Sequence, residues 1–505
     1  MSDAPDINSV LVVGAGIMGS GIAQVAAQSG HPVLLFDNRP GAAVDAKAAL
    51  QATFDKLVEK GKFSDDFARK ALSAITPVES LEAAATVDLV VEAVIEDIEI
   101  KRGLFRQLED IVGEDCILAT NTSSISVTAL ANGLRYPERL VGMHFFNPVA
   151  LMKLVEVVSG LQTSSAVAES IQNLAKSWDK VPVHARSTPG FIVNRIARPF
   201  YAETLALLQE RAATPGLLDA CLRGAGFRMG PCELMDLIGH DTNFSVTRSV
   251  YEANFFDKRY APSPVQQELV DGGLLGRKSG RGFYDYSADE KPGVVEYPAP
   301  AAAPAFDSLA VRGRGPIAER IARALQQHGL RFERIHDSKW VGLQVDSARL
   351  RLTDGRCASE LGRDVAVFDL PLTDEAGTVL AWSHAGRAAE QWVTDAPDWL
   401  ALIGFVPQRI ADTPGLVVAR TIAMLINEAA DAVQQGVCSE TGANDAMKLG
   451  VNYPAGPFEW LAQWHSSAVV ALLDRLDDFY RGERYRVSPW LRHHAWRKSS
   501  GPAGA

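Results

Sequence analysis

The sequence predicts an α/β protein in which a doubly wound sheet is followed by an all-helical domain, a degenerate α/β segment and a second copy of the helical domain. Short apolar runs alternate with helical segments in the first part of the chain, which favours parallel strands joined by crossover helices. After residue 188 the pattern becomes helical. The helical part is duplicated, since TPG at 188–190 recurs at 413–415 and GPxEL at 230–234 recurs as GPxEW at 456–460.

The first domain is expected over residues 1–187. An apolar run at 10–13 ends in a glycine turn, a helix is expected over 20–28, and a second strand at 33–36 completes a βαβ unit. Further expected elements are a helix over 42–60 and strands at 88–91, 117–120, 140–143 and 154–158.

Four segments are expected after this domain: a helical domain at 188–286, a Pro/Ala-rich linker at 287–305, a degenerate Rossmann-like remnant at 306–410 and the second helical copy at 411–498. One long helix is expected over 192–209. The remnant is inferred from an apolar run at 308–311 followed by Gly313-Arg314-Gly315-Pro316, which would be a poor phosphate cradle because of its proline and arginines.

Composition excludes several classes of protein. The chain has 505 residues, of which 47% are hydrophobic and 22% charged, so neither a disordered nor a fibrous protein is expected. Its net charge of −11 argues against a nucleic-acid or anionic-membrane surface, although a small phosphate-bearing ligand needs only a local site. The sequence has no long uncharged apolar run and no evident signal peptide, and its five cysteines form no CxxC pair. We therefore expect a cytoplasmic protein without a membrane segment or a metal site.

The glycine turn indicates a dinucleotide. Gly14 permits the tight turn, Gly16 lets the backbone approach a diphosphate, and Gly19 lets helix and strand pack closely. Asp37 at the end of the second strand would bind an adenosine ribose and repel a 2′-phosphate, which favours NAD over NADP. Arg39 leaves NADP open, because an arginine can accept that phosphate. The alternative interpretation is a close-packed turn without a ligand.

Polar residues follow several of the predicted strands. The stretch VEAVIE at 91–96 places two acids after a strand, with Lys101 in the helix that follows. NTSS at 121–124 and HFFNP at 144–148 follow two more strands, and Glu156 lies within the next one. Because ligands of doubly wound sheets bind at the carboxyl ends of the strands, we expect these side chains to line one crevice.

These motifs, in this order, resemble the 3-hydroxyacyl-CoA dehydrogenase family. The matching stretches are GAGIMGSGIA, VVEAVIE, NTSS, HFFNPV, MKLVEVV, TPGFIVNR, GPCELMDLIG and GRKSGRGFYDY. The resemblance implies a Rossmann-like NAD-binding domain and an enzyme that oxidises L-3-hydroxyacyl-CoA to 3-oxoacyl-CoA, a reaction of fatty-acid β-oxidation. The whole layout is similar to the long bacterial form of the family, often assigned to 3-hydroxyadipyl-CoA oxidation in phenylacetate breakdown. 3-Hydroxybutyryl-CoA is the alternative substrate.

The resemblance also implies roles for single residues. His144 is the general base and Glu156 orients its imidazole, and histidine suits this task because it titrates near neutral pH. Ser123 and Asn194 bind the reacting oxygen or the thioester carbonyl. The implied cofactor contacts are Gly14, Gly16, Met18, Gly19, Asp37, Glu96, Lys101, Ser123, Asn147 and Lys278. The implied substrate contacts besides Ser123 and Asn194 are Thr53 and Lys60, which match coenzyme A positions; Thr53 replaces a serine there.

The second half departs from the family pattern. Ala419 stands where the first copy has Asn194, and the remnant has no HFFNP or NTSS, so we expect it to be catalytically silent. In shorter family members the helical domain makes the dimer contact. A homodimer is therefore expected, with pairing of the two fused copies inside one chain as a further hypothesis.

Other interpretations of the function remain open. A non-catalytic dinucleotide-binding protein would keep the fold, but the presence of Ser123, His144, Glu156 and Asn194 disfavours it. A multifunctional enzyme with hydratase or epimerase activity would need a crotonase-like domain, which residues 300–505 do not supply. The acyl chain stays open, and Arg195, Arg198 and Arg228 are candidates to pair with a distal carboxylate.

Overall fold

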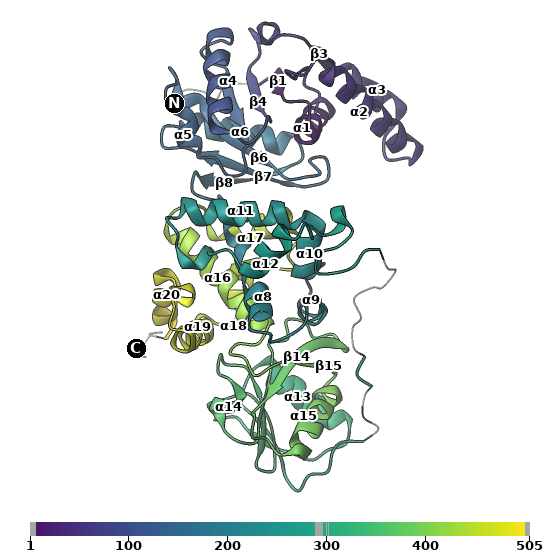
Figure 1. The fold of residues 1–505 in the computed structure, drawn as a ribbon, viewed down its shortest axis with the longest axis vertical. Helices are drawn as coiled ribbons and strands as arrows, with labels where there is room; N and C mark the ends of the chain where they lie inside the picture. Colours follow the sequence, from purple (N-terminus) through teal and green to yellow (C-terminus); the bar gives the residue numbers. More distant parts are fainter. Residues whose placement is uncertain (1–6, 288–295, 299, 301, 500–505) are drawn as a thin grey trace, which may run out of the picture. The chain divides into compact units, whose positions relative to one another are not determined.

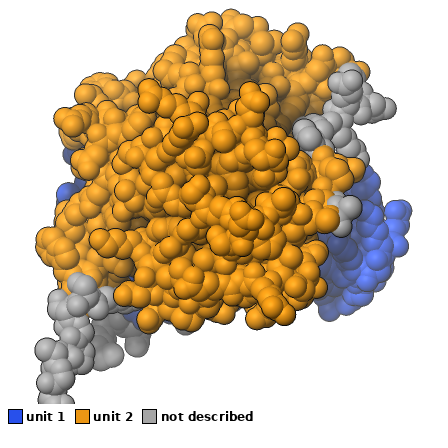
Figure 2. Space-filling view, turned by 90° about the horizontal axis from the view of Figure 1, so that it is seen from below, with its two compact units in different colours: residues 1–195, 432–451 blue, residues 196–431, 452–505 orange. Residues whose placement is uncertain are grey.

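The computed structural model describes residues 7–287, 296–298, 300 and 302–499 (Figure 1). These residues form two compact units (Figure 2). Unit 1 comprises residues 1–195 and 432–451, and unit 2 comprises 196–431 and 452–505. Two of the three boundaries fall inside helices, α7 (Val193–Ile196) and α16 (Val418–Gln434), and the third follows α17 (Glu440–Val451). The five predicted segments therefore do not coincide with the two units, and their boundaries stay predictions; much of the expected linker at 287–305 lies outside the described residues.

Unit 1 is built on an eight-stranded sheet with the order β3-β2-β1-β4-β5-β6-β7-β8. Its strands are β1 (Val10–Val13), β2 (Val33–Phe36), β3 (Ile75–Val78), β4 (Leu89–Glu92), β5 (Ile117–Thr120), β6 (Leu140–Phe145), β7 (Leu154–Ser159) and β8 (Val181–Arg186). All neighbours run parallel except β6 and β7, which are antiparallel. The chain order reverses at β1, which is the place where doubly wound sheets bind ligands.

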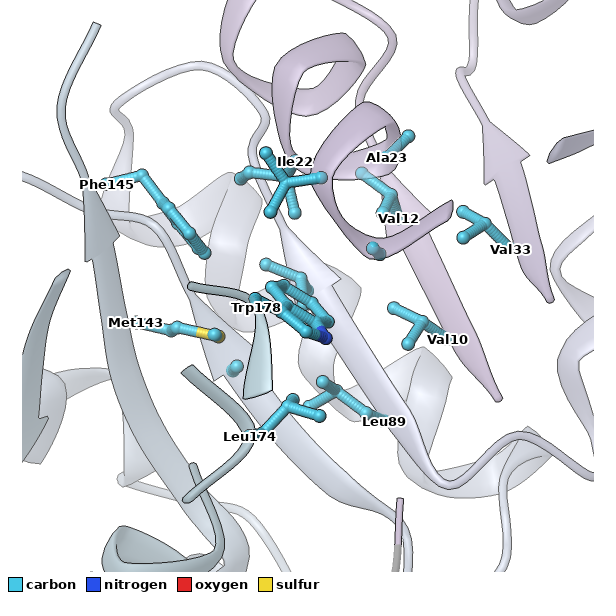
Figure 3. Close-up of a cluster of buried hydrophobic side chains, with 14 of the residues drawn as sticks. Val10, Val12, Ile22, Ala23, Val33, Leu89, Met143, Phe145, Leu174 and Trp178 are labelled. Carbon is cyan, nitrogen blue, oxygen red and sulfur yellow. The ribbon is translucent and has the colours of Figure 1, made fainter. Parts of the chain in front are cut away.

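Helices connect these strands. They are α1 (Ile17–Gln28), α2 (Ala42–Glu59), α3 (Asp65–Ser73), η1 (Leu81–Ala84), α4 (Ile98–Ile111), α5 (Val127–Ala131), η2 (Pro137–Arg139), α6 (Ser165–Ser177) and, from the second helical copy, α17 (Glu440–Val451), which packs against β7 and β8. Alternate strand residues face α1 and α6: Val10 and Val12 join Ile22 of α1 and Leu174 of α6 in one buried cluster (Figure 3).

The first helical copy of unit 2 contains α8 (Arg198–Gln209), α9 (Pro215–Gly224), α10 (Pro231–Ile238), α11 (His240–Ala253), η3 (Lys258–Tyr260), α12 (Pro264–Asp271) and η4 (Arg277–Ser279). The second copy adds α18 (Pro457–Trp464), α19 (Ser466–Tyr480), η5 (Glu483–Tyr485) and α20 (Pro489–Ser499). The single helix expected over 192–209 is wrong, because the chain breaks at Ala197 between α7 and α8. Pro199 in the first turn of α8 explains the break, since it cannot donate a backbone hydrogen bond.

The two helical copies contact each other reciprocally within unit 2. Glu203 of α8, which is fully buried, accepts hydrogen bonds from Arg484 Nε (2.9 Å) and the Tyr485 hydroxyl (2.9 Å) of the second copy. The equivalent residue of the second copy is Glu428 of α16. It accepts a hydrogen bond from the Tyr260 hydroxyl (2.6 Å) and forms an ion pair with Arg259 (3.3 Å), both of the first copy. The repeat seen in the sequence therefore corresponds to a repeated set of buried polar contacts.

A second, seven-stranded sheet has the order β10-β9-β11-β12-β13-β14-β15. Its strands are β9 (Leu309–Arg312), β10 (Glu333–Ile335), β11 (Gly342–Val345), β12 (Ala348–Leu352), β13 (Val365–Phe368), β14 (Thr378–His384) and β15 (Phe405–Arg409). Its helices are α13 (Pro316–Gln327), α14 (Ala358–Leu361) and α15 (Glu390–Leu402). The first three elements, β9, α13 and β10, form a parallel βαβ unit. The pairs β12–β13 and β14–β15 are also parallel, while β9–β11, β11–β12 and β13–β14 are antiparallel.

Asp369, directly after β13, lies on this sheet's junction with the second helical copy. Its carboxylate is fully buried and accepts the backbone N–H groups of Val417, Val418 and Ala419 at 2.7–2.9 Å. Burial raises the pKa of Asp369 to about 6, although these N–H groups oppose the shift.

The predicted fold class is confirmed: a Rossmann-like sheet is combined with a helical domain. Two strands that sequence reasoning did not predict, β3 and β8, form the two edges of the first sheet. Each contains a proline, Pro77 or Pro182, which weakens the strand signal and is tolerated at a sheet edge.

Candidate active site

The three glycines of the first turn meet three different demands. Gly14 has φ +106°, and a Cβ there would lie 2.5 Å from the carbonyl oxygen of Ala93. At Gly19 a Cβ would lie 1.7 Å from the carbonyl oxygen of Gly14, so the helix could not approach the strand. A Cβ at Gly16 would meet nothing within 4 Å. Gly16 therefore borders open space at the start of α1, where a diphosphate would approach the helix N-terminus.

Asp37 follows β2 and is held in place on both sides. Its Oδ2 accepts the backbone N–H of Ala15 at 2.8 Å, and its Oδ1 accepts Arg39 Nε at 2.9 Å. The hydrogen bond from Arg39 is the main reason that the pKa of Asp37 is lowered to about 2; burial opposes this shift and the Ala15 N–H supports it. The carboxylate is therefore ionised at any physiological pH, and Arg39 is engaged by it.

A cavity of about 710 Å³ connects the glycine turn with Asp37 and Arg39. Its other walls include 79–82 after β3, 93–95 after β4, and Ile100, Leu104 and Gln107 of α4. The stretch 91–96 was expected at such a crevice, but the walls from 79–82 and α4 were not predicted; residues 79–82 follow the edge strand β3, which was also missed. The open space at Gly16 and the ionised Asp37 fit the diphosphate and ribose of a dinucleotide.

A second cavity, of about 610 Å³, lies between α1, α2 and the loop after β6. Gly16, Thr53 and Asn147 all line it, so three of the predicted ligand contacts are brought together. Lys60 is exposed at the C-terminal end of α2 and is not among the lining residues. Met18 lies half-buried against the hydrophobic cluster of unit 1 and lines neither cavity.

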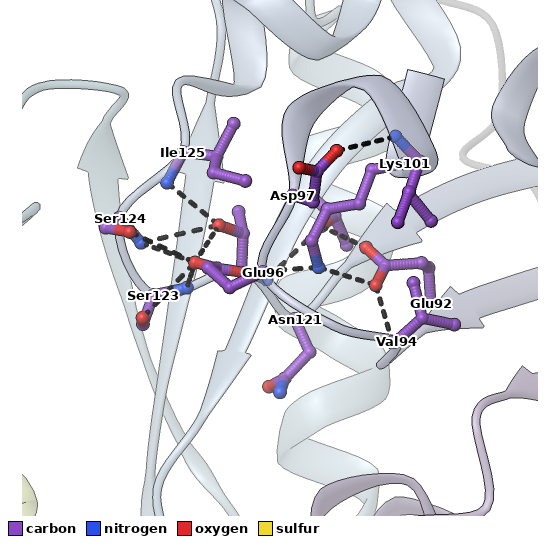
Figure 4. A network of polar contacts seen from close by, with 12 residues as sticks. Glu92, Val94, Glu96, Asp97, Lys101, Asn121, Ser123, Ser124 and Ile125 are labelled. Carbon is purple, nitrogen blue, oxygen red and sulfur yellow. Dashed lines mark hydrogen bonds and ion pairs between the residues drawn. The ribbon is translucent and has the colours of Figure 1, made fainter. Parts of the chain in front are cut away.

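Glu96 organises the NTSS turn (Figure 4). Its Oε1 accepts the Thr122 hydroxyl at 2.6 Å and the backbone N–H groups of Ser123 and Ser124 at 2.9 and 3.1 Å. Burial by itself would raise the pKa of Glu96, but the charge of Lys101 and these hydrogen bonds lower it overall. The Ser123 hydroxyl lies 3.3 Å from the same carboxylate oxygen.

Lys101 is 1% exposed, and its Nζ contacts Glu92 at 2.6 Å and Glu96 at 3.2 Å. Its single positive charge is thus shared by two acids next to the NTSS turn (Figure 4). A direct contact between Lys101 and a cofactor stays a prediction.

His144 and Glu156 form a buried pair on neighbouring strands. The antiparallel register of β6 and β7 places them directly opposite each other, and His144 Nδ1 lies 2.6 Å from Glu156 Oε2. His144 lies inside β6, not after it as expected, because β6 continues to Phe145. The other carboxylate oxygen, Oε1, accepts the backbone N–H groups of Ile192 and Val193 at 3.1 and 3.0 Å. Glu156 is therefore fixed at both oxygens, and it fixes the imidazole by Nδ1.

Two asparagines border this pair. Asn194 Nδ2 donates to the Ser123 carbonyl oxygen at 3.4 Å, so α7 and the NTSS turn, both of unit 1, meet next to the histidine strand. Asn121 Oδ1 accepts the backbone N–H of Phe145 at 2.8 Å. Asn121 belongs to the NTSS stretch that was expected to line the crevice, but it was given no role of its own; its place directly after β5 is the signal that marks it.

Lys180 holds the loop that carries Asn147. Its Nζ is buried and donates to the carbonyl oxygens of Val149 (2.5 Å) and Met152 (2.9 Å). Burial, helped by the nearby charge of Lys153, lowers the pKa of Lys180 to about 8. Sequence reasoning did not find this residue, because an isolated lysine before a strand looks like a surface residue.

Lys278 is the one predicted cofactor contact that lies in unit 2; Arg198 and Arg228, the candidates for a distal carboxylate, lie there as well. The Nζ of Lys278 forms an ion pair with Asp241 Oδ1 at 2.5 Å, and this contact lowers the pKa of Asp241. The other predicted residues lie in unit 1.

The described part of the chain shows neither a metal site nor a membrane-spanning helix. No group of three or more His, Cys, Asp or Glu side chains there is arranged to hold a metal ion. None of the helices described there is long and apolar enough to span a bilayer.

Comparison with protein families identifies three regions. Residues 9–188 match the NAD binding domain of 3-hydroxyacyl-CoA dehydrogenase, and residues 190–286 and 415–503 match its C-terminal domain. Residues 350–414 match the reduced Rossmann-fold domain of 3-hydroxybutyryl-CoA dehydrogenase.

Individual relatives agree with these matches. A 3-hydroxyadipyl-CoA dehydrogenase of Escherichia coli is 42% identical over 97% of this chain and 98% of its own. A mitochondrial hydroxyacyl-coenzyme A dehydrogenase of Sus scrofa is 39% identical over 55% of this chain and 91% of its own. The crystal structure of a 3-hydroxybutyryl-CoA dehydrogenase from Escherichia coli K12 covers 99% of this chain and 100% of its own, with a TM-score of 0.89 and 42% identity. The chain thus belongs to the 3-hydroxyacyl-CoA dehydrogenase family of NAD-binding oxidoreductases.

Proposed function

We propose that this enzyme oxidises an L-3-hydroxyacyl-CoA to the 3-oxoacyl-CoA with NAD, and that 3-hydroxyadipyl-CoA is its substrate. The buried His144–Glu156 pair, held by the backbone of 192–193, is the observation that carries the reaction. The choice of acyl group is supported by the similarity to the 3-hydroxyadipyl-CoA dehydrogenase, which extends over 97% of the chain. 3-Hydroxybutyryl-CoA is the second candidate, because the structural relative that covers 99% of the chain carries that name.

In the proposed mechanism His144 is the general base. Its Nδ1 is occupied by Glu156, so the proton resides on Nδ1 and Nε2 is left to take the proton of the substrate hydroxyl. The ring gains a positive charge in this step. Glu156 is fully buried opposite the ring, and its carboxylate would stabilise the imidazolium as it forms. In the reverse direction the same imidazolium returns the proton.

Ser123 and Asn194 are proposed to bind the reacting oxygen. Both belong to unit 1, and the Asn194 amide already lies beside the Ser123 backbone. A hydroxyl and an amide can each donate to the oxygen as it becomes a carbonyl. Neither side chain needs to change its charge during the reaction.

We assign the cofactor to the larger cavity. Gly16 would leave room for the diphosphate, Gly14 and Gly19 allow the tight turn and the close helix packing that form this site, and Asp37 would bind the ribose hydroxyls of the adenosine. NAD supplies the acceptor for the hydride that leaves the carbinol carbon. Asn147 and Lys278 are retained as proposed cofactor contacts, and Thr53 and Lys60 as proposed contacts of coenzyme A.

Assembly and location follow as proposals. The family resemblance favours a homodimer, while the reciprocal contacts of Glu203 and Glu428 inside unit 2 show where two helical copies already pair. We also propose that the enzyme acts in the cytoplasm, since its five cysteines are free.

Absorbance of NADH provides the test. The purified enzyme is mixed with NAD and, in turn, the 3-hydroxy derivatives of butyryl-, hexanoyl- and adipyl-CoA. We expect NADH formation with all three and the highest kcat/KM with adipyl. Formation of NADH with none of them would reject the catalytic function and favour a dinucleotide-binding protein, whereas a preference for butyryl would reject the proposed acyl group alone.

A further inference from the structure

A cavity of about 200 Å³ inside unit 2 is lined by two arginines, Arg198 of α8 and Arg484 of η5. The hydroxyl-bearing side chains of Tyr201, Thr247 and Ser263 line it as well. The described residues that form its wall include no aspartate or glutamate. The cavity is therefore rich in hydrogen-bond donors and positive charge.

Arg198 is buried at the wall of this cavity, with 5% of its surface exposed. Its Nη1 donates to the Thr247 hydroxyl at 3.0 Å, and its guanidinium lies over the Tyr201 ring, 5.0 Å from the ring centre. Burial lowers the pKa of Arg198, which reflects the cost of holding this charge away from water. Its planar group is suited to bind a carboxylate with two parallel hydrogen bonds.

Arg484 contributes a donor that the protein itself does not use. Its Nε donates to Glu203 at 2.9 Å, which fixes the guanidinium. Its Nη2 is buried and has no hydrogen-bond partner among the described residues. Buried donors without a partner are rare in folded proteins, because each one loses its hydration without compensation. An anionic oxygen in the cavity would satisfy this nitrogen.

The remaining wall residues favour an anion with an aliphatic part over phosphate or sulfate. Ala202, Ala206 and Pro262 give the cavity small apolar surfaces beside the two arginines. Methylene groups would pack on these surfaces, whereas a phosphate or sulfate would leave them unused. An aliphatic acid with a few carbons fits both the volume and the division of the walls.

We propose that this cavity binds the carboxylate of a short aliphatic acid through Arg198 and Arg484. A free dicarboxylate such as adipate has this chemistry, and the cavity with both arginines lies within unit 2. The proposal does not depend on the proposed function.

Calorimetry on the full chain measures the binding of adipate, with adipamide, which has the same carbon chain but no charge, as the control ligand. Arg198→Gln removes the charge and keeps a polar side chain near Thr247. We expect it to weaken adipate binding by tenfold or more, as expected for loss of a charge-assisted hydrogen bond.

Ala202→Leu fills the cavity without changing a charge. It should also weaken adipate binding, and it serves if Arg198→Gln fails to fold. Arg248→Gln is the matched control, because this arginine of α11 is 63% exposed and is not among the cavity residues; it should leave adipate binding unchanged.

Binding of adipate but not adipamide, weakened by Arg198→Gln or by Ala202→Leu and not by Arg248→Gln, supports the proposal. Absent adipate binding, or binding that neither cavity variant changes, overturns it. The oxidation assay of the proposed function has no part in this test, so either proposal can fail without the other.

Discussion

Replacing Glu156 by glutamine keeps the shape of the side chain but removes its charge. In the wild type one carboxylate oxygen contacts His144 Nδ1 at 2.6 Å and the other accepts the N–H groups of Ile192 and Val193 at 3.1 and 3.0 Å. The glutamine carbonyl can keep the two backbone donors. Its NH₂ group then faces Nδ1 and requires that nitrogen to accept a hydrogen bond. The proton of the ring moves to Nε2, the nitrogen that should receive the substrate proton.

The magnitude follows from this inversion. Losing a positioned general base costs roughly 10²–10⁴-fold in rate, or about 3–5 kcal/mol of barrier. The change in stability should be smaller, about 1–2 kcal/mol, because hydrogen bonds to a charged acceptor are replaced by neutral ones.

The assay is the initial rate of NADH formation at saturating substrate, together with NADH binding followed by fluorescence. Glu156→Gln should lose turnover and keep its affinity for NADH. Ser159→Ala is the control: it removes a hydroxyl from the same strand, where it contacts His184 at 2.9 Å, and should behave as wild type. A Glu156→Gln enzyme with normal kcat would refute the tautomer argument.

Three further predictions concern other parts of the chain. Gly19→Ala should prevent folding, since the new Cβ would lie 1.7 Å from the Gly14 carbonyl oxygen. Gly16→Ala should keep the wild-type Tm but bind NADH at least tenfold more weakly. Equal Tm values for the two variants would contradict this pair of predictions. Asp37→Asn should weaken NADH binding by a similar factor at pH 7 and pH 5, because the lowered pKa of about 2 keeps the wild-type carboxylate ionised at both. The effect of the substitution should disappear only as the pH falls through about 2. Equal NADH affinity of variant and wild type would rule out a role of Asp37 in binding. Burial raises the pKa of Asp369 to about 6, so the folded state binds more protons than the unfolded state between about pH 4 and 6. As the pH rises through that window, the free energy of unfolding of the wild type should fall by up to about 3 kcal/mol relative to that of Asp369→Asn. A pH-independent difference between the two in urea unfolding would count against this prediction.

The central strands of the first sheet could be predicted from the sequence, but its two edge strands could not. The strands around β1 are continuous apolar runs, because they are buried on both faces. The edge strands β3 and β8 are partly exposed and contain prolines, so their apolar signal is weaker. Missing β3 also hid the 79–82 wall of the larger cavity.

The candidate site was predictable in its residues but not in its connections. The motifs pointed to His144 and Glu156, yet only the register of β6 and β7 shows that they face each other across two strands. The support from the 192–193 backbone, the Asn121 contact with Phe145 and the pinning of the loop by Lys180 depend on tertiary packing. No local pattern of residues encodes such contacts.

The paired glutamates of unit 2 have a consequence for how this protein can change. When two identical subunits associate, one codon change alters both halves of the contact at once. Here Glu203 and Glu428 are encoded separately, and each has its own arginine and tyrosine partner. One contact can therefore drift, or be repaired by a nearby second substitution, while its twin keeps the two copies together.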